Sequence, residues 1–484
     1  MKKEETAWAV SLIIIALLAM QLPGSTPARD EDYAFVRTLV DIQRQVLNRY
    51  VENVPADKLR QGAIDGMLNQ LDPYTMYVPP QQQKAFDQML DGSFDGVGIQ
   101  LHQEENGTIE VITPIDDSPA FKAGVLAGDI VVKVNGQSLE KLRLPDVTKL
   151  IQGKSGSEVL LRIRRGTQEM DLKMSRQQVI VPTVRGFERR ADNTWNYYVN
   201  PREKIAYIRI TQFTGDTFDK FKAAVTSLLN DGMKGLILDL RFNPGGRLDS
   251  ATKIVDLFID QGVIVSTRGR SRPEETVFAT AKDTLPKFPL VVLVNGSSAS
   301  AAEVVSGSLK DNRRALVIGS RTFGKGSVQE LVPLDQDSGE LKMTVAYYYL
   351  PSGRLVHRKK DATDWGVIPH ITVDVDKAQD ARIYRERTDT DLFRRPATAT
   401  ATSPTTQPIS ADTQLQRAVD SMMALIVLQN PSGATTMPTT LVSAPAGAEA
   451  EPPTDEPKAP GKVGDPFEQN DEPDNTEPAE PMNP

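Results

Sequence analysis

One apolar segment and the turn that follows it constrain the fold of this 484-residue chain more than any other feature. Residues 290–294 read LVVLV, the continuous apolar pattern of a strand that is buried on both faces. A turn of small residues follows at 295–299, and Ser300 then begins a helix-like run. Strand and helix patterns alternate in the same way from 177 to about 375, which predicts an α/β core. The expected elements are strands at 205–210, 235–240 and 290–294 and helices at 217–229 and 250–259.

Ser300 is a candidate nucleophile because of its place at a strand-to-helix turn. The run Ser300-Ala301-Ala302-Glu303 fits a capping box, and its simplest meaning is the start of a helix. A serine there also lies beside unpaired N–H groups and the positive end of the helix dipole. Such groups can stabilise the oxyanion of an acyl-transfer reaction.

Lys325 lies between two glycines, 25 residues after Ser300. A lysine with the ordinary pKa of about 10.4 is charged near neutrality and cannot act as a base. Burial against apolar side chains such as Phe323 and Val328, or a neighbouring cation, would lower that pKa. In such surroundings Ser300 and Lys325 would form a Ser–Lys hydrolase pair, in which lysine replaces histidine as the base. A flexible surface loop is the simpler explanation of the lysine taken alone.

Other kinds of catalytic site fit these residues less well. Residues 319–326 nearly match a phosphate-binding loop, but Gly326 stands where a metal-binding Ser or Thr is required. A strand pattern follows at 328–332 instead of a helix, which argues against a nucleotide site. The absence of cysteine excludes disulfides, thiol catalysis and Cys-ligated zinc. The chain has three histidines, none in a recognisable catalytic context: His102, His357 and His370.

The N-terminus has the pattern of an export signal. Two lysines precede an apolar run from Ala7 to Met20, and small and turn-forming residues continue to Ala28. A run of 14 residues is short for a membrane-spanning helix and typical of a signal-peptide core. Because Pro27 adjoins the expected cleavage point, an uncleaved inner-membrane anchor stays open for residues 1–28. Both alternatives predict an exported protein of the periplasm or cell envelope.

The C-terminal residues 430–484 are rich in proline, alanine and glutamate, and are predicted to be disordered. Ten acidic and two basic residues after Ala450 account for the whole net charge of −8. The rest of the chain is therefore nearly neutral, which argues against nucleic acid as the partner.

Residues 92–176 carry four ordered landmarks of a small β domain. They are the glycine-led strand Gly96-Val97-Gly98-Ile99-Gln100-Leu101, a short helix at 118–124, a strand closing in an Asn-Gly turn at 126–136, and a last strand at 159–165. The segment resembles a PDZ domain. By that resemblance the Gly96–Ile99 loop binds a substrate's C-terminal carboxylate, and the sheet edge accepts the peptide as an added strand.

The remaining segments are predicted to be helical or linking. Residues 29–91 have helical spacing that breaks at Leu71-Asp72-Pro73-Tyr74, and a docking segment is the simplest interpretation. Residues 377–429 are predicted to be a polar linker followed by a C-terminal helix at 412–428.

Taken together, these motifs resemble the carboxyl-terminal processing proteases of peptidase family S41, from about Tyr33 to Leu428. The resemblance implies a ClpP/crotonase-like α/β protease core at 177–376 with an inserted PDZ domain. It is carried by Leu71-Asp72-Pro73, the PDZ-like segment, DLRFNPGG at 239–246, SSASAAE at 297–303, TFGKGSVQ at 322–329 and YYYLPSG at 347–353.

The resemblance also implies roles for single residues. Ser300 would be the nucleophile, Lys325 the general base and Gln329 the residue that positions the lysine. The oxyanion hole would consist of the Ala301 N–H and a glycine of the Gly245-Gly246 pair.

The implied activity is that of an exported serine endopeptidase that cleaves proteins near their C-termini. The PDZ domain would read the free C-terminus of the substrate and gate the active site. No metal or organic cofactor is implied. An adaptor or activator protein, and pairing of terminal helices in a homodimer, stay open. A PDZ scaffold on an inactive protease fold and a nucleotide-binding protein are the alternative classes.

Overall fold

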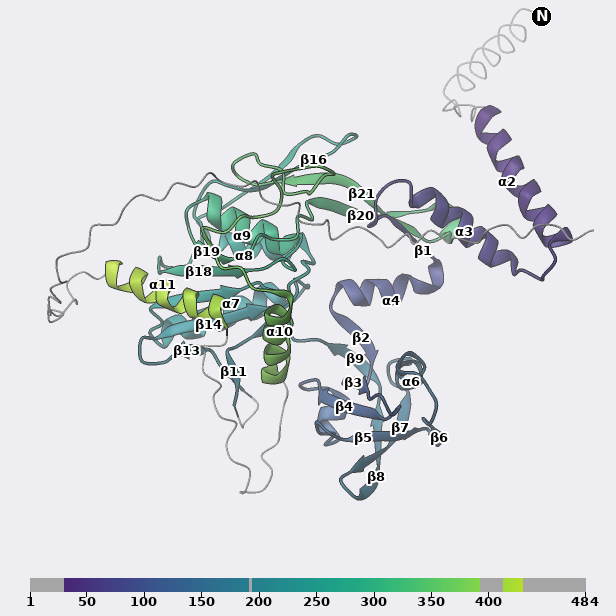
Figure 1. The fold of residues 1–484 in the computed structure, drawn as a ribbon, viewed down its shortest axis with the longest axis horizontal. Helices are drawn as coiled ribbons and strands as arrows, with labels where there is room; N and C mark the ends of the chain where they lie inside the picture. The colour runs from purple at the N-terminus through teal and green to yellow at the C-terminus, as the bar shows by residue number, and fades with distance from the viewer. Residues whose placement is uncertain (1–29, 191–193, 392–411, 430–484) are drawn as a thin grey trace, which may run out of the picture. The chain divides into compact units, whose positions relative to one another are not determined.

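The structure, a computed structural model, describes residues 30–190, 194–391 and 412–429 (Figure 1). The expected signal peptide or anchor at 1–28 and the acidic tail at 430–484 therefore lie outside the described residues. Among the helices within the described ranges, none combines the length and apolar content that a membrane crossing requires.

The α/β core is built on a seven-stranded sheet, and its architecture confirms the prediction from the alternating pattern. Five of its strands run parallel, in the order β14-β15-β18-β19-β22. Two strands pair antiparallel with β14. The strands are β10 (Val184–Arg185), β13 (Tyr198–Asn200), β14 (Ile205–Ile210), β15 (Gly235–Asp239), β18 (Leu290–Val294), β19 (Leu316–Gly319) and β22 (Ile371–Thr372).

Helices cover both faces of this sheet because successive strand residues point to opposite sides. Ile208, Leu238 and Val292 belong to one apolar cluster, which includes residues of α7, α8 and α9. Tyr207 and Val291 belong to a second cluster on the other face, which includes residues of α11. The covering helices are α7 (Thr217–Asn230), α8 (Leu248–Asp256), α9 (Ala301–Asp311) and α11 (Thr413–Gln429).

A second, five-stranded antiparallel sheet carries the lysine loop. Its longest strand, β21, pairs with β20, with β16 and with the N-terminal strand β1. The N-terminal segment is thus part of a core sheet. The strands are β1 (Met76–Val78), β16 (Val263–Arg268), β17 (Glu275–Phe278), β20 (Ser327–Pro333) and β21 (Glu340–Tyr349).

The PDZ-like domain has its own sheet and its own apolar core. The predicted Asn-Gly hairpin is confirmed, since Asn135 and Gly136 have φ angles of 50° and 82° between two paired strands. The elements are β3 (Ile99–Gln103), β4 (Ile109–Pro114), α5 (Pro119–Lys122), β5 (Ile130–Val134), β6 (Gln137–Ser138), α6 (Leu144–Ile151), β7 (Glu158–Arg165) and β8 (Gln168–Ser175).

The strand predicted from Gly96 to Leu101 is wrong in its first part. The chain enters through β2 (Ser93–Gly96), which pairs antiparallel with the exit strand β9 (Gln177–Ile180), and β3 begins only at Ile99. Between them Gly98 has a φ of 77°, and a Cβ on it would lie 2.3 Å from the Cβ of Ser118. The break is therefore enforced by close packing that glycine alone permits.

The N-terminal segment is helical as predicted, with α2 (Asp30–Arg49), α3 (Ala56–Leu68) and α4 (Pro80–Leu90). The polar linker predicted from residue 377 is wrong in its first part, because Lys377–Asp391 forms helix α10. This helix is highly polar, and its buried residues are Ile383 and Arg387. Because only one of the two is apolar, the sequence has no apolar periodicity that would predict a helix here. The remaining elements are β11 (Glu188–Arg189), β12 (Trp195–Asn196) and the 3₁₀ turn η1 (Asp335–Asp337).

Candidate active site

Ser300 lies at the turn between β18 and α9, directly before the first residue of the helix. Its φ of 54° and ψ of −117° are unusual for a residue with a side chain. Such a conformation costs free energy, and it recurs where a sharp strand-to-helix turn presents a nucleophile. Ser300 is only 8% exposed. Its neighbours Ala299 and Ala301 are also buried, so the turn is largely shielded from water.

Hydrogen bonds fix this turn to the loop that follows β15. The Ser298 hydroxyl donates to the Leu240 carbonyl at 2.8 Å, and the Ala299 N–H donates to the Asn243 carbonyl at 2.9 Å. The Phe323 N–H donates to the Ser298 carbonyl at 3.0 Å. Three segments that are distant in the sequence are thus held together at the carboxyl edge of the sheet.

Glu303 joins the candidate nucleophile to the lysine loop. Its carboxylate is fully buried and accepts the N–H of Ser300 at 2.8 Å. The same carboxylate accepts the Thr322 hydroxyl at 2.5 Å, the Gly324 N–H at 2.7 Å and the Lys325 N–H at 2.8 Å. Burial raises the pKa of Glu303, while these four donors favour its ionised form. The capping-box pattern predicted only the first of these bonds.

Lys325 occupies a half-buried position at this junction. Its Nζ lies 4.5 Å from the ring centroid of Tyr74. Burial lowers the pKa of Lys325, the positive charge of Lys342 lowers it further, and Glu303 and Asp72 oppose the shift. The predicted cover is wrong in part, because Phe323 is 42% exposed and Tyr74 faces the amine instead. Within the described residues, no hydrogen bond joins the Lys325 amine to the Ser300 hydroxyl.

Tyr74 comes from the Leu71–Thr75 turn, which the sequence showed only as a break between helices. Asp72 forms this turn by accepting the N–H groups of Tyr74 and Thr75 at 2.8 and 2.9 Å and the Thr75 hydroxyl at 2.9 Å. These bonds hold the pKa of Asp72 below its usual value, although burial opposes them. The Thr344 N–H of β21 donates to the Thr75 hydroxyl at 3.3 Å. The turn is therefore attached to the sheet of the lysine loop.

The two glycines proposed for the oxyanion hole differ in their hydrogen bonding. A Cβ on Gly245 would lie 2.7 Å from the Cβ of Ser300, so this residue packs directly on the nucleophile. Its N–H, however, donates to the Asn243 side chain at 2.8 Å. In the part of the chain that is described, the N–H groups of Gly246 and Ala301 donate to no other group. The structure thus leaves these two N–H groups, and not that of Gly245, without a partner among the described residues.

Gln329 is not bonded to Lys325 in this structure. Its amide donates to the Ser327 hydroxyl at 2.8 Å and more weakly to Thr344 at 3.4 Å. A residue that the sequence did not single out, Tyr348, instead contacts the Ser300 side chain. Burial raises the pKa of Tyr348 to about 12, and a hydrogen bond with the Ser300 side chain opposes this rise. Tyr348 belongs to the YYYLPSG motif, but nothing in its spacing indicated this contact.

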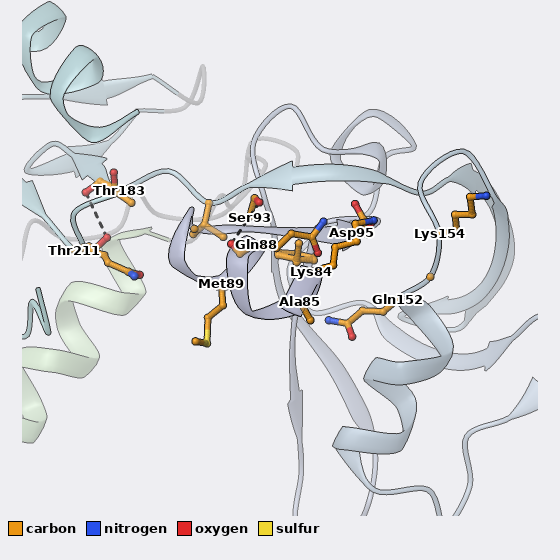
Figure 2. A pocket seen from close by; sticks show the side chains of 15 residues that line it. Lys84, Ala85, Gln88, Met89, Ser93, Asp95, Gln152, Lys154, Thr183 and Thr211 are labelled. Atoms are coloured by element: carbon orange, nitrogen blue, oxygen red, sulfur yellow. Dashed lines mark hydrogen bonds and ion pairs between the residues drawn. The ribbon is translucent and has the colours of Figure 1, made fainter. Parts of the chain in front are cut away.

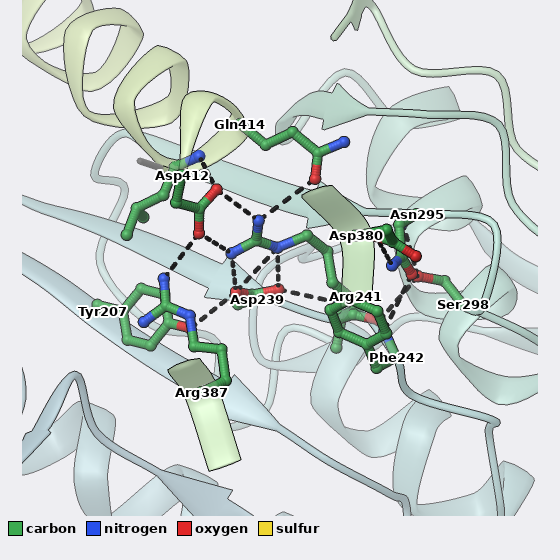
Figure 3. Close-up of polar contacts among 12 residues, drawn as sticks. Tyr207, Asp239, Arg241, Phe242, Asn295, Ser298, Asp380, Arg387, Asp412 and Gln414 are labelled. Atoms are coloured by element: carbon green, nitrogen blue, oxygen red, sulfur yellow. Dashed lines mark hydrogen bonds and ion pairs between the residues drawn. The ribbon is translucent and has the colours of Figure 1, made fainter. Parts of the chain in front are cut away.

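A buried ionic cluster supports the strand that leads into the glycine loop (Figure 3). Arg241 bonds to Asp239 at 2.7 Å and to Asp412, the residue before α11, at 2.8 Å. Arg387 of α10 bonds to Asp412 at 3.0 Å, and the Tyr207 hydroxyl donates to Asp239 at 2.7 Å. The two arginines hold the pKa of Asp412 far below its usual value. The C-terminal helices are thus connected to the active-site loop through charge.

A cavity of about 660 Å³ has none of the candidate catalytic residues in its lining (Figure 2). It is lined by residues of α4, by β2 and by the turn after α6, together with Thr183 and Thr211. Ser93 and Asp95 on its wall directly precede the Gly96–Ile99 loop of the PDZ-like domain. Within the described ranges, no group of three or more acidic or histidine side chains is placed to hold a metal ion.

Comparison with known proteins gives matches along most of the chain. The model of peptidase family S41 matches residues 204–373, that of the PDZ domain matches 110–165, and that of the activating protease CtpB N-terminal domain matches 22–81.

Whole-chain relatives agree with these family models. A carboxy-terminal-processing protease of Bartonella bacilliformis is 38% identical over 366 residues, which cover 74% of this chain and 80% of the relative. A probable CtpA-like serine protease of Staphylococcus aureus is 35% identical over 73% of this chain and 67% of its own length. Among solved structures, a photosystem II D1 C-terminal processing protease is 30% identical, with a TM-score of 0.40 over 69% of this chain and 92% of that one.

Proposed function

Since this chain belongs to peptidase family S41 and is a serine protease of the carboxy-terminal-processing type with a PDZ domain, we propose that Ser300 and Lys325 form its catalytic pair. The observation that carries the proposal is the Glu303 carboxylate, which accepts backbone N–H groups from both residues. The Ser300 turn and the Lys325 loop, which α9 and β19 separate along the chain, are thereby joined through one carboxylate.

The proposed reaction begins with a proton transfer. Neutral Lys325 takes the Ser300 proton, and the serine oxygen attacks the carbonyl carbon of a substrate peptide bond. The resulting oxyanion is stabilised by the N–H groups of Ala301 and Gly246. Lys325 then gives its proton to the leaving amine, and an acyl-enzyme remains on Ser300. Water, deprotonated by the same lysine, releases the new C-terminus.

The lowered pKa of Lys325 supports its role as the base. A desolvated lysine near a second cation has a larger neutral fraction near pH 7 than a lysine in water. In this structure the Ser300 side chain contacts Tyr348, and among the described residues no hydrogen bond joins it to the Lys325 amine. Catalytic bonds often tighten only when substrate is bound, so a rotation of both side chains would form the pair.

We further propose that the Gly96–Ile99 loop reads the C-terminus of protein substrates and that its occupancy gates cleavage. Gln329 would orient Lys325 in the substrate-bound form. Export to the periplasm or cell envelope, an inner-membrane anchor, an activator protein and a homodimer belong to the same proposal and rest on the N-terminal pattern and the family.

Mass spectrometry of a denatured protein incubated with wild type, Ser300→Ala and Lys325→Ala tests the catalytic pair. We expect cleavage near the C-terminus by wild type and a fall in rate of roughly 10⁴-fold or more in both variants, since such groups act as a unit. An acyl-serine probe should label wild type and not Ser300→Ala. Cleavage by Lys325→Ala at the wild-type rate would remove the lysine from the mechanism, and absence of labelling in wild type would favour a scaffold.

A further inference from the structure

We propose that Tyr74 is a positioning residue for the catalytic lysine, and that the N-terminal Leu71–Thr75 turn supplies an aromatic cover without which Lys325 is neither oriented nor shielded from water. This inference rests on the proposed role of Lys325 as the base. It assigns a part in catalysis to a segment that the sequence indicated only as a docking element.

The first observation is the contact itself. The Nζ of Lys325 lies 4.5 Å from the centroid of the Tyr74 ring, within the range of a cation–π contact. The ring face attracts the ammonium form and fixes the direction of a side chain that would otherwise rotate freely. The ring also occupies space that water would fill, because Tyr74 is half-buried at this contact.

The second observation is that the turn is built to hold this ring in place. Asp72 accepts three hydrogen bonds from Tyr74 and Thr75, each between 2.8 and 2.9 Å. Thr75 in turn accepts the N–H of Thr344 on β21. The ring is therefore fixed relative to β21, the strand that also pairs with β20 directly after the lysine loop.

The third observation is that the same segment covers a second lysine. Strand β1 pairs Met76 with Lys342 on β21, and the Nζ of Lys342 lies 5.8 Å from the ring centroid of Phe86 in α4. The hydroxyl of Tyr77 donates to the Ser338 carbonyl at 2.7 Å and fixes the far end of the strand. Two aromatic rings of the N-terminal segment thus lie over two lysines of the core.

Four charged or titratable groups face Lys325 from the elements around it. Lys342 on β21 disfavours its charged form, whereas Glu303 on α9 and Asp72 in the turn favour that form. Tyr74 is the fourth group, and its own pKa is raised by burial, so its phenol stays neutral. Removing the ring would end the cation–π attraction but would also admit water to the amine, and hydration stabilises the ammonium form more than the ring face does.

The test measures kcat/KM against pH for wild type, Tyr74→Phe and Tyr74→Ala, with a peptide whose cleavage site has been mapped. Tyr74→Phe keeps the ring and should stay within about twofold of wild type, with the acid limb of the profile at the same pH. In Tyr74→Ala the acid limb should move to higher pH by about one unit, with a loss of about tenfold near neutrality. An acid limb of Tyr74→Ala that superimposes on that of wild type would overturn the proposal.

A structural role alone predicts a different result, namely an equal loss at every pH together with a lower unfolding midpoint. If Tyr74→Ala does not fold, Tyr74→Leu keeps the apolar volume without the ring. It should lower kcat by about fivefold at an unchanged unfolding midpoint, because the lysine loses its orientation. An unchanged kcat in Tyr74→Leu would contradict the proposal.

Two further variants separate the possible failures. Tyr77→Phe removes a hydroxyl from the same segment but leaves the ring over Lys325 in place, so its pH profile should match that of wild type. Lys325→Ala tests the premise: if it is fully active, the proposed catalytic pair fails. If Lys325→Ala is inactive while Tyr74→Ala has the wild-type profile, only the role of Tyr74 fails.

Discussion

Two cations in the protease core, Arg241 and Lys325, have opposite electrostatic surroundings. Arg241 is fully buried and bonds to the carboxylates of Asp239 and Asp412 (Figure 3). Lys325 is half-buried and faces an aromatic ring, and within the described residues it forms no ion pair. These partners raise the pKa of Arg241 well above its usual value, whereas burial and Lys342 lower that of Lys325.

The difference shows how one domain uses buried charge for two purposes. Carboxylates paired with Arg241 keep it charged at every pH near neutrality. The ion pairs that join β15, the glycine loop and the start of α11 therefore do not depend on pH in that range. An unmatched amine is destabilised in its charged form and becomes available as a base. Three predictions test this contrast, beginning with the largest expected effect.

Asp412→Ala should destabilise the protein by about 3–5 kcal/mol, because it leaves Arg241 and Arg387 buried without their shared partner. Chemical denaturation of the variant measures this loss. Asp420→Ala is the matched control, since that carboxylate is exposed on the adjoining helix α11 and, among the described residues, accepts a hydrogen bond from Gln416 alone. A loss below about 1 kcal/mol in Asp412→Ala would mean that the cluster is not the main attachment of α11.

Lys325→Met should change the free energy of unfolding in the opposite direction from Asp412→Ala. It should stabilise the protein near neutral pH by an amount on the order of 1 kcal/mol. The pKa of Lys325 is lower in the folded than in the unfolded chain. Between these two pKa values the unfolded chain binds more protons, so wild-type stability rises with pH. The variant lacks this rise, and its advantage should shrink as the pH approaches 10.5. Thermal unfolding at several pH values measures it, and a variant less stable than wild type at pH 7 would show that the charge of Lys325 is favourably matched.

Lys342→Met should have the smallest effect, a loss of a few-fold in kcat/KM near neutrality. Without the second cation the pKa of Lys325 rises, so a smaller fraction of the base is neutral. The acid limb of the pH profile should move to higher pH, while the rate at high pH stays unchanged. Lys204→Met removes an exposed lysine paired with Asp231 and should leave the profile unaltered. A shift of the acid limb to lower pH would show that Lys342 raises the pKa of Lys325 and does not lower it.

The sequence was sufficient for the local parts of this molecule. Continuous apolar runs predicted the buried parallel strands, and the alternation with helices predicted the α/β core. Ser300 at the strand-to-helix turn and the Asn-Gly hairpin of the PDZ domain were predicted for the same reason. Their conformations depend on neighbouring residues, whose chemistry can be read directly from the chain.

The contacts between distant segments were beyond the sequence. Tyr74 covers Lys325 from about 250 residues away, and nothing in the spacing of either motif indicates this pairing. Helix α10 was missed because it is held by the buried ion pair of Arg387 with Asp412 and by Ile383, and not by a continuous apolar face. The sequence also did not show that the Gly245 N–H donates to the Asn243 side chain. The N–H of the neighbouring Gly246 therefore replaces it in the proposed oxyanion hole.

Glu303 has one more consequence for how this protease can be switched. Its carboxylate accepts N–H groups from Ser300 on one side and from Gly324 and Lys325 on the other. The backbones of the proposed nucleophile and base are therefore joined through Glu303, and separating them would break several hydrogen bonds to a buried carboxylate. Rotation of the Ser300 and Lys325 side chains, and binding of the substrate, require none of these hydrogen bonds to break. An activating signal would therefore act on these two steps. Regulation in such an enzyme would act on rotamers rather than on the assembly of the site.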